Sequence, residues 1–403
     1  MANIYLDYGA ATPVDKRVLH RMKRYWRGDF ANPSSIHRAG VQAKQAVSEA
    51  RKDIAQFLHA HDREIIITSG GTEANNLALV GVVRASGKKL SDIHIITTPI
   101  EHASILETVS ALAHDGVQVS YVPVNEEGIV DVKALRELIR RETLIISIGY
   151  ANSEIGTIQP MKDIMKVIRH ARNELLGTRY GMPYMHTDAS AAGQYLSCNV
   201  AELGIDLLTL DAQKVYGPKG VGVLYARDTV PLVATLYGGG QENDRRSGTE
   251  NVPLIVGCAE ALFYASDIRE KEFARLARLR DWFFSELQQK IPEAIINGST
   301  QSRLPNNINI SLFPTGIYAQ SDGEMMVLRL DERGITASSA SACASGSGES
   351  KVVRYIAGQS GISETKAVAR ARQTLRFTMG RDTRKRHIKK LLMELVRLVG
   401  SRV

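Results

Sequence analysis

Residues 206–225 read DLLTLDAQKVYGPKGVGVLY, two short apolar runs on either side of a lysine and a Gly-Pro turn. Continuous apolar runs of this kind, which include IIIT at 65–68, suit strands of a parallel sheet that is buried on both faces. The predicted strands are Glu64–Thr68, Ile93–Thr98, Gln118–Val122, Leu144–Gly149, Tyr184–Thr187, Asp206–Leu210 and Val221–Tyr225.

Longer amphipathic stretches separate most of these runs and predict helices. They are Thr72–Val83, Ala103–His114, Val132–Arg140 and Met161–Leu176. Alternation of strands and helices predicts an α/β fold with a mostly parallel sheet flanked by helices.

The pattern changes at Asn251, where a long helical stretch rich in Ala, Leu, Glu and Arg begins and continues to about Ile291. Strands are predicted near Asn307–Leu312 and Thr374–Thr378, and a last helix from about Arg384. We therefore expect a large domain of residues 15–255 and a smaller α+β domain of residues 1–14 and 256–403. Ser338–Ser350, SSASACASGSGES, consists of small polar residues that cannot pack a core, and is predicted to be a mobile loop.

Composition narrows the class of protein. The 403 residues are 44% hydrophobic and 23% charged, which is typical of a globular protein, and no apolar stretch is long enough to span a bilayer. Three cysteines, an odd and sparse number, fit a reducing compartment, and no secretory signal is visible, so a cytoplasmic location is expected. The net charge of +8 includes a basic cluster at 381–390, which lacks the interleaved aromatic residues of a nucleic-acid binder. We expect neither a nucleic-acid nor a membrane partner, and no metal site.

Lys214 and Asp188 follow two different buried runs. A lysine at such a position is costly unless it is paired or chemically used, and desolvation makes its amine a better nucleophile for a Schiff base. A buried carboxylate at Asp188 needs a cationic partner, which the protonated ring nitrogen of pyridoxal 5′-phosphate (PLP) would provide. A surface lysine and a helix N-cap are the structural alternatives for the two residues.

Two further positions lie between a strand and a helix. Ser69-Gly70-Gly71-Thr72-Glu73 could cradle a phosphate at a helix N-terminus, although a plain strand-to-helix turn has the same composition. His102, after the strand at 93–98, could stack on a planar cofactor and move protons, or be a structural histidine.

Arg376 and Cys343 are the candidates in the smaller domain. A guanidinium at 376 could bind a substrate carboxylate through two hydrogen bonds, or form a structural ion pair. Free cysteines are usually buried and inert, whereas Cys343 lies on a Ser/Gly segment where a thiolate could move between a substrate and a partner.

Taken together, the chain resembles the cysteine desulfurases of the iron–sulfur cluster assembly type. These are fold-type I PLP enzymes of the aminotransferase class V family. The resemblance rests on motifs that occur in the same order along nearly the whole chain. They are YLDYGAATPVD, ANPSSIH, TSGGTEANN, IEHAS, ANSEIGTIQP, TDAS, QKVYGPKGVG, GGGQE, RRSGTEN, SSASACAS and LRFTMG.

The resemblance implies a role for each matched residue. Lys214 would bind PLP covalently, Asp188 would pair with its ring nitrogen, and His102 would stack on the ring. Cys343 would take the sulfur of L-cysteine as a persulfide, releasing L-alanine, and pass it to a sulfur-acceptor or iron–sulfur scaffold protein. The remaining implied cofactor ligands are Gly71, Thr72, Asn152, Asp211, Gln213 and Thr249, the last from the second subunit of a homodimer. The implied substrate ligands are Asn32, Asn152 and Arg376.

The chain departs from the family pattern at three places. Ala191 stands where a glutamine usually contacts the phenolic oxygen of the cofactor, with Gln194 nearby in sequence. Asp211-Ala212-Gln213 replaces Ser-x-His, and Ser153 replaces a second asparagine. These changes predict weaker cofactor retention, because Ala191 cannot donate a hydrogen bond. They motivate one alternative, a cofactor-impaired scaffold that binds a sulfur-acceptor protein. A selenocysteine lyase or other class V aminotransferase is the other alternative.

Overall fold

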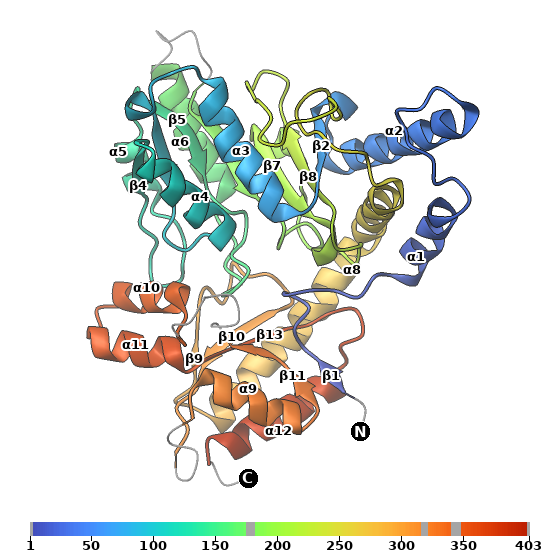
Figure 1. Cartoon of the computed structure of the whole chain (residues 1–403). Helices are drawn as coiled ribbons and strands as arrows, with labels where there is room; N and C mark the ends of the chain where they lie inside the picture. Colours follow the sequence, from blue (N-terminus) through green and yellow to red (C-terminus); the bar gives the residue numbers. More distant parts are fainter. Residues whose placement is uncertain (1–2, 175–181, 316–320, 340–347, 401–403) are drawn as a thin grey trace.

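The structure, a computed structural model, describes residues 3–174, 182–315, 321–339 and 348–400. Its largest sheet has seven strands in the order β2-β8-β7-β6-β5-β3-β4 (Figure 1). β8 runs antiparallel to both of its neighbours and the other pairs are parallel, so the predicted mostly parallel sheet is confirmed. The strands are β2 (Ile65–Thr68), β3 (His94–Thr97), β4 (Gln118–Tyr121), β5 (Thr143–Ser147), β6 (Tyr184–Asp188), β7 (Leu207–Asp211) and β8 (Gly222–Ala226).

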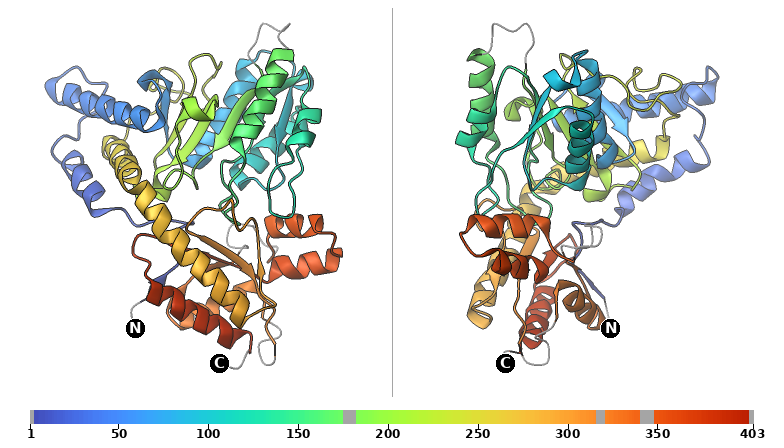
Figure 2. Two further views of the ribbon diagram at one scale, coloured as in Figure 1. Left: turned by 180° about the vertical axis from the view of Figure 1, so that it is seen from behind. Right: turned by 60° about the vertical axis from the view of Figure 1, so that its left-hand side comes forward.

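Helices cover both faces of this sheet. α3 (Gly71–Ala85) packs across β5 to β8 beside α4 (Ala103–His114), and α6 (Met161–Glu174) lies on the opposite face with α5 (Val132–Leu138) (Figures 1 and 2). Double-sided cover explains why β2, β3, β5, β7 and β8 are buried along their whole length, whereas the edge strand β4 is partly exposed. A short α7 (Val200–Leu203) precedes β7.

A smaller antiparallel sheet, in the order β12-β13-β10-β9, forms the second part of the molecule. Its strands are β9 (Ile295–Ile296), β10 (Asn307–Ser311), β12 (Ser338–Ser339) and β13 (Thr374–Thr378). α9 (Gly323–Glu332), α10 (Lys351–Gln359), α11 (Glu364–Arg372) and α12 (Lys385–Leu398) surround it. The N-terminal segment joins this part, since β1 (Ile4–Tyr5) pairs with β11 (Ile335–Thr336) and both termini lie there (Figure 1).

α8 (Val252–Lys290) extends from the large sheet to the small one and is continuous over 39 residues (Figure 2). It packs against α1 (Lys16–Lys23), α2 (Arg38–Leu58) and α12. The boundary proposed at residue 255 lies inside this helix, and the division into two domains stays a prediction.

Most predicted elements are present within one or two residues of the expected ends, and α4 and β13 have the expected bounds. One prediction is corrected: Ser338 and Ser339, expected in a loop, form β12, because their backbone pairs with Leu375 and Arg376 of β13. None of the described helices combines the length and the apolar character needed to cross a membrane. No cluster of metal-ligating side chains occurs among the described residues.

Candidate active site at the carboxyl edge of the large sheet

The predicted site residues of the large sheet gather because of strand direction. β3, β5, β6 and β7 are parallel, and β2 points the same way because β8 is antiparallel to both β2 and β7. The loops after their carboxyl ends therefore share one edge of the sheet, where ligands of open α/β sheets bind. The residues at these strand ends or shortly after them are Gly71, His102, Asn152, Asp188, Asp211 and Lys214.

Lys214 ends a short 3-10 helix, Ala212–Lys214, that directly follows β7. Its Nζ donates to the backbone carbonyls of Gly9, at 2.6 Å, and Ala10, at 2.7 Å. The side chain is half-buried, which excludes the alternative of a fully exposed surface lysine. Uncharged carbonyl oxygens thus hold the amine at the carboxyl edge of the sheet.

Asp188 and His102 are joined by a chain of side-chain hydrogen bonds. Asn75 Nδ2 donates to Asp188 Oδ2 and to Ser104 Oγ, both at 2.8 Å, and Ser104 Oγ lies 2.8 Å from His102 Nδ1. The other oxygen of Asp188 accepts from the backbone N–H of Ser190. Neutral donors therefore fix the carboxylate in place without neutralising its charge.

His102 is also the N-cap of α4. Its Nδ1 accepts the backbone N–H of Ser104 at 3.1 Å, which requires an unprotonated Nδ1, so the neutral ring carries its proton on Nε2. The histidine thus has a structural role through one nitrogen and keeps the other for a second partner. Its side chain is exposed.

Glu101 lies behind this network. Thr98 Oγ1 donates to its carboxyl at 2.7 Å, and the N–H of Gly149 donates at 3.0 Å. Burial raises the pKa of Glu101 to about 7, and the nearby charge of Asp188 adds to the rise. A carboxyl that can hold a proton near neutral pH therefore lies close to Asp188.

The N-terminus of α3 is held by Asp211. Asp211 Oδ2 accepts the N–H of Gly71 at 3.2 Å and the side-chain amide of Gln213 at 3.0 Å, and its Oδ1 accepts the backbone N–H of Gln213 at 3.1 Å. Thr72, in the same first turn, is exposed, and the buried hydroxyl of Ser190 has no hydrogen-bond partner. A carboxylate therefore occupies the predicted phosphate cradle.

Arg376 lies on β13 and is 8% exposed. Its Nη2 donates to Asp7 Oδ1 at 3.2 Å and to Ser338 Oγ at 3.1 Å, while its Nε is buried without a partner. The residue thus forms the structural ion pair that was the alternative to substrate binding. The unpartnered Nε still offers a donor to an anionic group.

Cys343 lies outside the described residues, within 340–347. Both ends of that segment are fixed. Ser338 pairs with Arg376 on the small sheet, and Ser350, the N-cap of α10, donates from Oγ to Glu154. Burial raises the pKa of the Glu154 carboxyl, which accepts this hydrogen bond from Ser350.

Asn152 lies at the carboxyl edge of the large sheet, whereas Asn32 does not. Asn152 Nδ2 donates to the carbonyl of Ile100, and its Oδ1 accepts the N–H groups of Glu154 and Ile155, so its amide fixes the loops next to His102. Asn32 belongs to the exposed loop between α1 and α2, and its side chain accepts from Ser34 in the same loop. The structure does not bring Asn32 to the other site residues.

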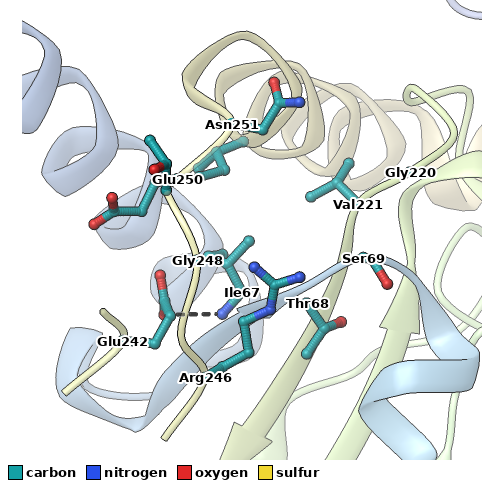
Figure 3. Close-up of a pocket in the computed structure, with 12 residues that line it drawn as sticks. Ile67, Thr68, Ser69, Gly220, Val221, Glu242, Arg246, Gly248, Glu250 and Asn251 are labelled. Carbon is teal, nitrogen blue, oxygen red and sulfur yellow. Dashed lines mark hydrogen bonds between the residues drawn. The ribbon is translucent and has the colours of Figure 1, made fainter. Parts of the chain in front are cut away.

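Thr249 lines a polar cavity of about 220 Å³ together with Thr68 and Ser69 at the end of β2. Figure 3 shows other residues of its lining. Arg246, which points into the cavity, pairs with Glu73 of α3 at 2.8 Å, and Glu242 accepts the N–H of Ile67. Glu242 also forms a partly buried ion pair with Arg51 of α2. These contacts hold the segment that carries Thr249 against β2 and the first turn of α3.

Several contacts of this site were not predicted from the sequence. Asn75 lies four residues after Gly71 in TSGGTEANN, which is one helical turn further on the same face. This spacing could have predicted that Asn75 faces the site. Asp7, Ser104 and Ser190 also lie within the quoted motifs, but only the fold shows their partners. Two residues that depart from the family pattern, Ala191 and Ser153, are half-buried. Gln194, which is close to Ala191 in the sequence, is 2% exposed and its Nε2 has no partner.

Comparison with known proteins places this geometry in a family. Residues 4–391 match the aminotransferase class-V family. A cysteine desulfurase IscS of Dictyoglomus turgidum is 41% identical over 98% of this chain and 94% of its own. Among solved structures, a NifS-like protein is 30% identical with a TM-score of 0.86, covering 99% of both chains. SspA in complex with cysteine is 34% identical with a TM-score of 0.74, covering 93% of this chain and 98% of its own.

The chain therefore belongs to the class-V aminotransferase family. Within that family it belongs with the cysteine desulfurases, with which it shares nearly its whole length. Members of the family generally use PLP. The residues at this edge fit the aldehyde and the ring of that cofactor, with an amine at Lys214 and a fixed carboxylate at Asp188. The fit is poorer at the phosphate end, where Asp211 accepts the N–H of Gly71.

Proposed function

We propose that this chain is a PLP-dependent cysteine desulfurase that leaves the sulfur of L-cysteine on Cys343 as a persulfide and releases L-alanine. The observation that carries the proposal is the hydrogen-bonded chain from Asp188 through Asn75 and Ser104 to His102, at the same sheet edge as Lys214. An acceptor for a ring nitrogen, a proton-carrying imidazole and an amine are the groups that this chemistry needs.

When bound, PLP supplies an electron-withdrawing ring that stabilises negative charge on the α-carbon of an amino acid. The residues of the chain would do the rest. Lys214 would hold the aldehyde carbon and then accept the α-proton on Nζ, while Asp188 would keep the ring nitrogen protonated. His102 would hold or donate a proton at Nε2, because its Nδ1 is an acceptor. The buried donor of Arg376 would orient the substrate carboxylate.

Sulfur transfer follows from the position of Cys343 in the chain. Its thiolate would attack the substrate sulfur, so that an S–S bond forms and the C–S bond breaks with its electron pair on carbon, which then takes a proton to give alanine. Cys343 is four residues from Ser339, so their Cα atoms are at most roughly 14 Å apart. Since the preceding strand pairs with Arg376, this limit supports a thiol near the substrate carboxylate.

A homodimer is part of the proposal. Large apolar side chains are exposed along α1, α2 and the loop that joins them, a pattern typical of interaction surfaces. They are Leu19, Trp26, Phe30, Ile36 and Val41. The segment of Thr249 would complete the site of the other subunit, and a sulfur-acceptor or iron–sulfur scaffold protein would take the persulfide. The free, buried Cys198 and Cys258 support a reducing, cytoplasmic location.

The test compares wild-type protein with Cys343→Ala and Lys214→Ala, and uses Ser341→Ala on the same segment as a matched control. With PLP, L-cysteine and a reductant, wild type and the control should release equal amounts of alanine and sulfide. Cys343→Ala should lose sulfide release and keep a visible absorption band that borohydride abolishes. Lys214→Ala should lose both the band and the products.

Sulfide release by Cys343→Ala at the wild-type rate would reject the proposal. Transamination without sulfide release in the wild type would favour another class V aminotransferase. Parallel assays with selenocysteine would test the lyase alternative.

A further inference from the structure

We propose that the Asp211 carboxylate takes the place of the cofactor's phosphate at the N-terminus of α3, so that this chain binds unphosphorylated pyridoxal about as readily as PLP. The inference rests on the proposed function, which requires an aldehyde of this class at Lys214. It goes further by naming the residue that sets the preference between the two forms of the aldehyde.

The carboxylate of Asp211 is built into the fold. Asp211 ends β7, is 9% exposed, and accepts three hydrogen bonds, from Gly71 N and from the backbone and side-chain amides of Gln213. All three donors are neutral amides. The negative charge therefore remains on the carboxylate and faces the first turn of α3.

A helix N-terminus attracts an anion through its free N–H groups and its partial positive charge. α3 is 15 residues long, and its N-cap, Gly70, has no side chain to bond these groups. Asp211, at the end of β7, supplies the missing acceptor. An incoming phosphate would have to displace the bond from Gly71 and approach a group of the same charge.

Space at this point is limited. A Cβ placed on Gly71 would lie 3.1 Å from Ser190 Oγ and 3.4 Å from Asp211 Oδ2, so the carboxylate and the hydroxyl are both against the backbone of α3. Ser190 Oγ is buried and has no partner. A neutral hydroxymethyl group, which pyridoxal carries in place of the phosphate ester, could accept a hydrogen bond from Ser190 without repulsion from Asp211.

The charge of each aldehyde decides in which direction a variant changes its affinity. PLP carries close to two negative charges on its phosphate near neutral pH, whereas pyridoxal carries none there. Removal of the carboxylate charge should therefore strengthen PLP binding by about tenfold or more, since like charges a few ångströms apart repel at this scale in a partly buried site. Pyridoxal binding should change by less than about threefold on the same argument.

The experiment measures the dissociation constants of PLP and pyridoxal by equilibrium dialysis, and follows the Lys214-dependent absorption band, in wild type, Asp211→Asn and Asp211→Ser. Asp211→Asn keeps an acceptor for Gly71, and Asp211→Ser removes the bulk as well, so one variant remains informative if the other does not fold. Asp92→Asn, an exposed position away from the site, controls for the loss of one negative charge.

A selective gain for PLP in the Asp211 variants, with near-equal affinities in the wild type, supports the inference. Unchanged PLP affinity, or an equal gain for both aldehydes, overturns it while leaving the proposed function intact. Failure of both aldehydes to form the Lys214-dependent band in any variant would instead reject the proposed function, and this inference with it.

Discussion

The side-chain amide of Asn75 donates to the Asp188 carboxylate at 2.8 Å, and the same Nδ2 donates to Ser104, which contacts His102. Asn75 is 1% exposed, and it sits on α3, between the elements that carry the two residues it connects. One buried amide thus sets the distance between the candidate ring-nitrogen partner and the candidate acid/base.

Asn75→Ala should lower kcat by about tenfold, because hydrogen bonds to charged groups contribute roughly 1.5–3 kcal/mol. The loss should come with a shifted pH profile of kcat, since Asp188 loses a direct donor and Ser104, which contacts His102, loses the same donor. Steady-state kinetics of alanine formation over a range of pH values would measure both effects. Asn76→Ala, the next residue on α3, is the control. A drop in thermal stability with an unchanged pH profile would mean that Asn75 is only structural.

Arg376→Lys should raise the KM for L-cysteine about tenfold or more and change kcat little. A lysine ammonium cannot reproduce the guanidinium fork that combines the ion pair to Asp7 with a second donor at Nε. Kinetics with varied cysteine would separate the two parameters. Arg372→Lys, an exposed arginine at the end of α11, should leave both unchanged. If the variants at 376 and 372 behave alike, Arg376 does not bind the substrate.

The native protein should react with one equivalent of a thiol reagent at neutral pH, although it has three cysteines. Cys198 and Cys258 are buried, and burial raises the pKa of each thiol to about 12, so both are protonated and shielded. Spectrophotometric titration should therefore give no rapid reaction for Cys343→Ala. Under denaturing conditions it should give all the thiols of each protein. Rapid labelling of two thiols in the native protein would contradict this.

Glu101→Gln should remove a pH dependence of stability. Burial raises the pKa of Glu101 from 4.5 to about 7, so the folded state holds a proton that the unfolded state releases between these values. The free energy of unfolding should therefore fall as pH rises from about 4.5 to about 7, by up to about 1.4 kcal/mol per pH unit, and then level off.

Chemical denaturation at several pH values would show this as a free energy of unfolding that falls for the wild type, relative to Glu101→Gln, as pH rises towards 7. Glu107→Gln, at an exposed position on α4, should follow the wild type. Parallel pH curves for wild type and Glu101→Gln would show that folding does not raise the pKa of Glu101.

The large sheet was predictable because its strands are buried on both faces and leave uninterrupted apolar runs, as in β2 and β7. The antiparallel direction of β8 was not, since a run of apolar residues carries no information about its direction. α2 was also not predicted. Its buried residues, which include Ala43, Val47, Ala50 and Ile54, recur at helical spacing, so the signal was present in the sequence.

For the site, the position of Lys214 after β7 and of Asp188 at the end of β6 followed from the strand pattern and is confirmed. The partners could not be predicted. The contacts of Lys214 with Gly9 and of Arg376 with Asp7 join residues more than 200 positions apart, and nothing local in the sequence specifies them. The roles given to these residues stay predictions until the variants above are measured.

Residues 7–10 contact both Arg376 on the small sheet and Lys214 at the edge of the large sheet. Asp7 holds Arg376, while the carbonyls of Gly9 and Ala10 hold the Lys214 amine. At most about 10 Å of backbone separates Asp7 from the carbonyls that accept from Lys214. A carboxylate that displaces Asp7 from the guanidinium would therefore loosen the carbonyls around the amine, so that the arrival of substrate at one end would help to release the nucleophile at the other.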